Sequence, residues 1–135
     1  MRDIYLRPLL TVALFDMPKV EKPHNGGEWS KARLMGFIRS TLRRSSTRWN
    51  PRALALKEAR RASQSDNKRL KWEFRCNSCG GWFARKDVEA DHIVPAGSLR
   101  DFDDLPGFAR RLFCEKDGFE ILCKAECHHK KTHTK

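Results

Sequence analysis

Two pairs of cysteines set the strongest constraint on how this chain can fold. Two residues separate Cys76 from Cys79, and three residues separate Cys123 from Cys127. Two thiols at such a spacing can reach one tetrahedral metal ion from a single tight turn. Because 43 residues lie between the pairs, one zinc ion bound by all four thiolates would clamp two distant parts of the chain together. The sequence therefore predicts a structural four-cysteine Zn²⁺ site.

The number of cysteines argues against a disulfide-bonded secreted domain. The chain has five, and an odd number leaves one thiol without a partner. Buried cysteines without a metal are the competing interpretation, which two close pairs make less favourable. Cys114 has no neighbouring cysteine in the sequence, so we expect a small buried side chain there. Metal-binding thiols are typical of a reducing compartment, and we expect a cytoplasmic protein.

A metal clamp also suits the composition. The chain has 135 residues, of which 39% are hydrophobic and 33% are charged, so its core is lean for its length. No apolar run reaches the ~18–20 residues that a membrane helix needs, and we expect no membrane association. The most apolar stretch, residues 9–15, lacks a small-residue cleavage site after it. We interpret it as part of an N-terminal arm rather than as a secretory signal.

The positive charge of the chain is concentrated in one segment. The formal net charge is +11, and residues 31–75, with fourteen basic and three acidic side chains, carry all of it. Such a concentration favours binding to a nucleic-acid backbone, because each Lys or Arg contact releases condensed counterions. The competing interpretation is a solvated basic surface that keeps the protein soluble.

The local patterns predict an α+β fold with three parts. Residues 1–28 are an arm and linker, residues 29–70 a basic helical extension, and residues 71–135 the part that carries the chemistry. In the extension, Ser30 and Asn50 are candidate caps of two helices, the second running from residue 51 to residue 62. The third part combines a strand, knuckle and strand over residues 72–83, strands over 88–94 and 119–122, a helix over 102–113 and a short helix from residue 126.

Two histidine motifs accompany the cysteines. Asp91 and His92 follow a strand, and His128 directly follows Cys127. An Asp-His pair by itself is weak evidence for catalysis. Together with the CNSC knuckle, however, the segments VEADHIVPAGSL (88–99) and LCKAECHHKKT (122–132) resemble the zinc-bearing branch of the HNH (ββα-metal) endonuclease family. The resemblance covers about residues 29–132 and is strongest to small HNH proteins encoded by tailed phages.

The resemblance implies a mechanism and partners. His92 would be the general base that activates water, and imidazole suits this because its ordinary pKa, ~6.5, lies near neutral pH. Asp91 and His128 would hold one catalytic cation, Mg²⁺ or Mn²⁺, with Ni²⁺ as a further candidate. The substrate would be double-stranded DNA in the cytoplasm of a host cell, with a phage packaging (terminase) protein as a candidate partner. The side chains expected to contact DNA are Arg33, Arg39, Arg43, Arg44, Arg48, Lys130 and Lys131.

Two features depart from the family pattern. The family's asparagine, which orients the base, is expected about five residues before Cys123, where this chain has Gly118. Asp117, Glu115 or a backbone group would have to replace it. The second cysteine pair also has one residue more than usual, which could displace His128. In addition, neighbouring side chains on a regular strand point to opposite faces, so Asp91 and His92 can act together only if the strand ends or bends there.

Three hypotheses follow. The first is a metal-dependent DNA endonuclease, in a variant subfamily that lacks the asparagine. The second is a zinc-stabilised DNA-binding module with weak or no catalysis. The third is a structural zinc ribbon whose positive charge holds an acidic protein.

Overall fold

The computed structural model describes residues 18–133. These residues fall into two compact units, divided between Leu34 and Met35. The first seventeen residues of the predicted arm, including its apolar stretch, lie outside the described residues. In the first unit, His24 and Trp29 pair through their backbones across a tight turn. Gly26 and Gly27 have positive φ angles of 64° and 87° in this turn, a conformation that glycine adopts without strain.

The predicted first helix is present as α2 (Lys31–Ser46). As expected, Ser30 caps it, because its Oγ accepts a hydrogen bond from the backbone N–H of Arg33 at 3.2 Å. The helix begins in the first unit and continues into the second. Met35 of this helix is buried, whereas Phe37 is 52% exposed.

The prediction for the second helix was wrong in two respects. The helix α3 (Asn50–Glu58) stops four residues earlier than expected, and its cap position is Trp49 rather than Asn50. Residues Arg60–Ala62 instead form strand β1, which pairs antiparallel with β2 (Trp72–Arg75). Residues 60–62 are Arg-Arg-Ala, which favour a helix by themselves, but pairing with β2 satisfies their backbone groups, and this tertiary gain outweighs the local propensity.

The predicted strand–knuckle–strand is confirmed. Strand β2 pairs antiparallel with the short β3 (Trp82–Phe83), and the knuckle that carries Cys76 and Cys79 connects them. Because β1 lies on the other side of β2, the three strands form one sheet in the order β1-β2-β3.

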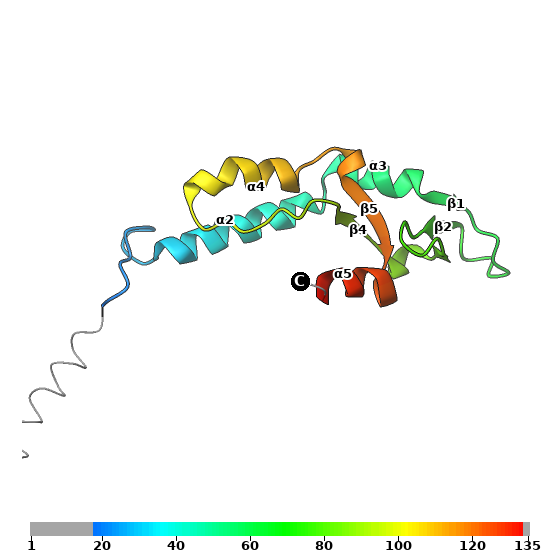
Figure 1. Cartoon of the computed structure of the whole chain (residues 1–135), viewed down its shortest axis with the longest axis horizontal. Helices are drawn as coiled ribbons and strands as arrows, with labels where there is room; N and C mark the ends of the chain where they lie inside the picture. The colour runs from blue at the N-terminus through cyan, green and yellow to red at the C-terminus, as the bar shows by residue number, and fades with distance from the viewer. Residues whose placement is uncertain (1–17, 134–135) are drawn as a thin grey trace, which may run out of the picture. The chain divides into compact units, whose positions relative to one another are not determined.

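A second sheet consists of β4 (Val88–His92) and β5 (Phe119–Cys123). They are antiparallel, with Val88 opposite Cys123 and His92 opposite Phe119. Strand β4 ends two residues before the predicted limit. The short helices are η1 (Arg85–Asp87) before β4, η2 (Phe102–Asp104) and α4 (Leu105–Leu112) between the strands, η3 (Lys116–Gly118) before β5, and η4 (Lys124–His128) with α5 (His129–His133) after it (Figure 1). The unit is thus a small mixed α+β domain.

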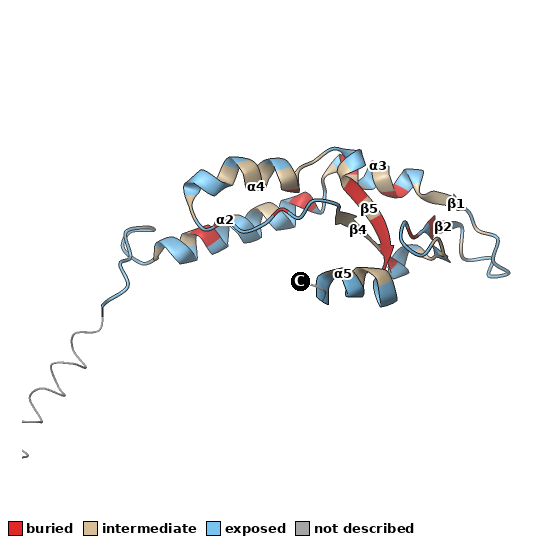
Figure 2. Ribbon diagram, viewed as in Figure 1, coloured by how far each residue is buried: buried red, intermediate tan, exposed pale blue. Residues whose placement is uncertain are grey.

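The hydrophobic core lies where α3 covers the β4–β5 pair. Strand β5 is the most continuously buried element (Figure 2). A second, smaller cluster consists of Leu122 and two of the metal-ligand candidates, Cys76 and Cys123. Cys76 and Cys123 therefore belong to the core, whereas Cys79 is exposed. The main cluster comprises Leu56, Phe74, Val88, Ala90, Phe119 and Ile121. None of the helices in the described part of the chain is both long and apolar enough to cross a membrane.

Candidate metal centre and the His92 cavity

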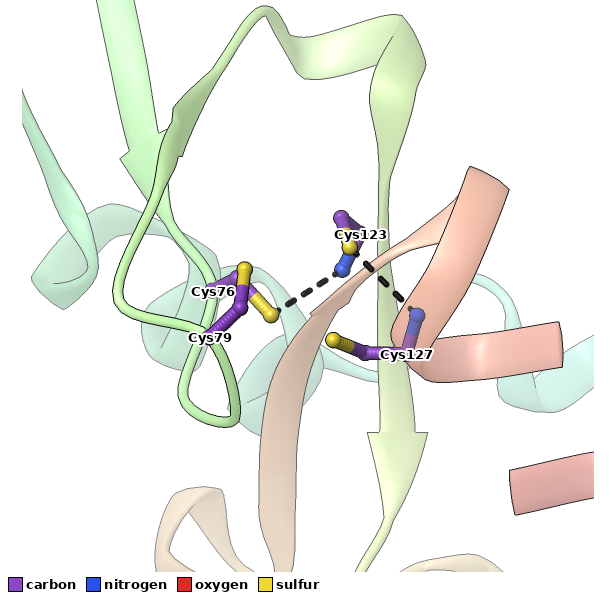
Figure 3. A group of neighbouring side chains, drawn as sticks. All are labelled: Cys76, Cys79, Cys123 and Cys127. Atoms are coloured by element: carbon purple, nitrogen blue, oxygen red, sulfur yellow. Dashed lines mark hydrogen bonds between the residues drawn. The ribbon is translucent and has the colours of Figure 1, made fainter. Parts of the chain in front are cut away.

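The structure brings the four paired cysteines together. The sulfur atoms of Cys76, Cys79, Cys123 and Cys127 all lie within 4.8 Å of one another (Figure 3). Four thiolates around a tetrahedral zinc ion, each with a Zn–S distance of ~2.3 Å, would be about 3.8 Å apart. The cluster is therefore close to the geometry that zinc needs, and these residues could hold a zinc ion.

Backbone hydrogen bonds shape the knuckle around the first pair. The N–H of Gly80 donates to the carbonyl of Cys76, and the N–H of Cys76 donates to the carbonyl of Gly81, both at 2.9 Å. Gly80 has a φ of 71°, which favours glycine. A Cβ at Gly81 would lie 2.9 Å from the Phe83 ring, so the chain can turn back over the sulfurs only without a side chain there.

The second pair joins the cluster through the end of β5 and the turn that follows. The N–H of Cys123 donates to the Cys76 sulfur at 3.3 Å, and the N–H of Cys127 donates to the Cys123 sulfur at 3.5 Å (Figure 3). The turn η4, which contains Cys127, is π-helical. A π-turn accommodates one extra residue, which explains how the longer gap still places Cys127 beside Cys123.

The thiols of the cluster have unequal pKa values. Burial raises the pKa of Cys76, but hydrogen bonds from the backbone N–H groups of Cys79, Cys123 and Ser78 outweigh it and lower the pKa to about 6. For Cys127, a hydrogen bond with Ser78 lowers the pKa, but contacts with neighbouring thiols and burial raise it to about 12. Without a cation, the negative charge of one thiolate therefore opposes deprotonation of the neighbouring thiols. A bound metal ion would relieve this repulsion.

The His92 side chain is held by a backbone carbonyl. Its Nε2 lies 2.8 Å from the carbonyl oxygen of Leu112, at the end of α4. A carbonyl can only accept, so Nε2 is the donor, and in the neutral form of the ring the lone pair is on Nδ1. The ring also packs against Phe119, with centroids 4.8 Å apart. A backbone group, one of the three alternatives left open by Gly118, thus orients this imidazole.

Gly118 has no room for a side chain. A Cβ there would lie 2.5 Å from the sulfur of Cys114, while its carbonyl accepts a hydrogen bond from the N–H of Ile93 at 2.9 Å. The asparagine expected at this position could not fit unless Cys114 moved.

Gly118→Ala is therefore expected to destabilise the protein by about 1–3 kcal/mol through overpacking. This corresponds to a melting temperature several degrees lower, measured by circular dichroism. Cys114→Ala, which removes the clashing sulfur, should recover part of the stability when combined with Gly118→Ala. A Gly118→Ala variant as stable as the wild type would contradict the tight contact.

Asp91, His92 and His128 line one cavity of about 310 Å³. Asp91 and His92 share the cavity although they are adjacent, because β4 ends at His92. The Asp91 Oδ1 accepts a hydrogen bond from the N–H of His92 at 2.9 Å. These two residues also line an adjoining cavity of about 210 Å³. Among the described residues, only the cysteine cluster brings three or more metal-binding side chains this close together.

Lys131 occupies the edge of this site. Its Nζ lies 2.5 Å from a Glu120 carboxylate oxygen, 2.6 Å from the His92 carbonyl and 3.2 Å from Asp91 Oδ2. Burial lowers the pKa of Lys131, but hydrogen bonds to Glu120 and Asp91 outweigh it and raise the pKa above its ordinary value. The sequence reasoning missed Glu120, although the pairing of the two predicted strands places it opposite Asp91.

The other residues expected to contact DNA lie in several places. Arg43 lines both cavities beside His92 and lies over the Phe108 ring, 5.8 Å from its centroid. Arg44 and Arg48 line a separate cavity of about 300 Å³. Arg33, in the first unit, lies over the Trp29 ring. Arg39 on α2 and Lys130 on α5 are exposed.

Comparison with known proteins returned no match to a family model, to a curated protein or to a solved structure.

Proposed function

We propose that this protein is a metal-dependent DNA endonuclease of the HNH type. The observation that carries the proposal is the cavity that Asp91, His92 and His128 all line, beside which a backbone carbonyl holds the His92 ring. The order β4, β5, then η4 and α5 agrees with a ββα arrangement, with Asp91 and His92 at the end of its first strand and His128 in the turn after the second.

His92 performs the proton transfer in this proposal. Because its Nε2 proton is directed at Leu112, its Nδ1 is the nitrogen that accepts a proton from the attacking water. That water attacks phosphorus as the bond to the 3′ oxygen breaks. Asp91 and His128 would hold Mg²⁺, Mn²⁺ or Ni²⁺, and when bound the cation supplies stabilisation of negative charge on the phosphate and the leaving oxygen.

Arg43 and Lys131 have supporting roles. Arg43 lies on the wall of the cavity, where a guanidinium attracts a phosphate. Lys131 joins α5 to the ends of both strands through Glu120 and the His92 carbonyl, so it positions Asp91 and His92 rather than contacting DNA freely.

A second candidate is a zinc-stabilised DNA-binding module without catalysis, which would serve a packaging partner. The observation that favours it is the ion pair between Lys131 and Asp91, because the ammonium group already satisfies the carboxylate that a divalent cation would need. The two proposals share the zinc centre and the basic surface and differ in the response to divalent metal.

A cleavage assay on supercoiled plasmid distinguishes the nuclease from the binding module. The zinc-loaded protein is incubated with plasmid and with Mg²⁺, Mn²⁺ or Ni²⁺, and the nicked and linear forms are quantified by gel electrophoresis. We expect conversion only when a divalent cation is added. A protein that retains zinc and shifts DNA in a gel but leaves the plasmid supercoiled with every metal would contradict the nuclease and favour the binding module.

A further inference from the structure

A further cavity in the second unit lies between α3, the first sheet and η1, and no cysteine lines it. It has a volume of about 450 Å³, and Leu56 and Phe74 form its apolar floor. Among the described residues that line it, four are cationic and none is acidic. These four are Arg52, Lys57, Arg60 and Arg85.

Protein groups hold three of these cations in place. Arg60 stacks on the Trp72 ring, with its guanidinium 4.0 Å from the centroid. Arg85 donates to the carbonyl of Val88 at 3.2 Å, and Arg52 forms an ion pair with Glu89. Because these interactions fix the guanidinium groups, the side chains give up little entropy when an anion binds. Lys57 is exposed on α3 and remains the adaptable fourth cation.

This cavity adjoins the cavity of about 310 Å³ that His92 lines. Thr47 and Arg52 line both, so the two adjoin along the start of α3. The cavity that His92 lines in turn shares Arg43, Asp91 and His92 with the adjoining cavity of about 210 Å³. A polyanion that entered beside His92 would meet Arg43, then Arg52, and then the remaining cations.

We propose that the cavity lined by Arg52, Lys57, Arg60 and Arg85 is a phosphate subsite, which binds a backbone phosphate of the DNA strand flanking the phosphate at His92. The occupant follows from charge complementarity. Arg52 is paired with Glu89, and the three other cations leave an excess of positive charge at the cavity that favours an anionic ligand. The choice of DNA as the polyanion rests on the proposed function, whereas the anion subsite itself rests only on the geometry of these residues.

The test compares two charge-matched double variants by fluorescence anisotropy with a short labelled DNA duplex. Lys57→Gln/Arg60→Gln removes two charges from the cavity, and Lys68→Gln/Arg69→Gln removes two from the exposed turn between β1 and β2. No divalent cation is added, so binding is measured without cleavage. Salt is varied from ~50 to ~200 mM, because the magnitude of the slope of log K against log salt decreases by about 0.9 for each phosphate that the protein no longer neutralises.

We expect the cavity variant to bind about tenfold more weakly and to have a shallower salt slope, by about 0.9 for the one phosphate lost, while the turn variant keeps the wild-type slope. Equal effects of the two variants would overturn the subsite, as would a wild-type protein that does not bind DNA. Polyglutamate that competes as well as DNA would also overturn it, because the cavity would then recognise acidic side chains.

Loss of the Arg60 stacking on Trp72 would also weaken the sheet. A second pair of variants therefore changes the charge at the cavity without removing Arg60. Lys57→Glu and Lys68→Glu each reverse an exposed charge, and melting curves establish that both are folded. Only Lys57→Glu should weaken binding and make the slope shallower. If binding depends on the cavity but plasmid is never cut, the nuclease proposal fails alone. If plasmid is cut and the paired variants behave alike, the subsite fails alone.

Discussion

Replacement of Cys76 by alanine is expected to abolish zinc binding and cooperative folding of residues 35–135. Cys76 and Cys123 are 0% and 2% exposed, and their sulfurs lie in the smaller core cluster with Leu122. The cluster joins the knuckle after β2 to the end of β5. Structural zinc can contribute ~10 kcal/mol or more to a small domain, comparable to the whole stability of about 5–15 kcal/mol that such domains have.

The measurements are zinc per chain by elemental analysis and unfolding by circular dichroism. Cys123→Ala should behave like Cys76→Ala, and a chelator added to the wild type should reproduce both. Cys114→Ala is the matched control, because this thiol lies outside the cluster, and it should retain one zinc ion and nearly the wild-type melting temperature. If the wild-type protein contains no zinc and has the same melting temperature as Cys76→Ala, the cysteines do not form a zinc site and serve only as packed side chains.

The His92→Ala variant is expected to be about 10²–10⁴-fold slower in metal-dependent plasmid nicking, the range that a general base usually contributes. In the proposal, Nδ1 of the neutral His92 ring accepts the proton, and water is too weak a base to replace it at neutral pH. His92 is half-buried at the end of β4, so its removal should change the melting temperature only modestly.

Two controls separate chemistry from folding. His129→Ala removes an exposed histidine of α5 and should leave the rate unchanged. Added imidazole should restore part of the rate of His92→Ala, because a small base can enter the vacated cavity, whereas a folding defect would not respond. If His92→Ala nicks plasmid at the wild-type rate, His92 is not the base. Loss of activity in His129→Ala would indicate that a second histidine binds the catalytic cation.

The sequence by itself determined the local features of this protein. The spacing of Cys76, Cys79, Cys123 and Cys127 predicted one four-sulfur cluster, which is confirmed, because the reach of two thiols from one turn is a local property. Residue patterns also predicted the helix that begins at Lys31 and the knuckle between two strands. They predicted, too, the strands that end near His92 and Cys123.

Only the tertiary structure decided how these parts combine. Residues 60–62 became a strand because β2 was available to pair with them. The partner of His92 is a carbonyl twenty residues away, and a backbone group has no signature in the sequence. Likewise, one cavity is lined by Arg52, Lys57, Arg60 and Arg85 only because η1 packs against β2 and β2 pairs with β1, the strand that follows α3. Local propensity favours a helix, strand or turn in each segment. Which side chains from distant segments come together, however, depends on tertiary packing that no single segment encodes.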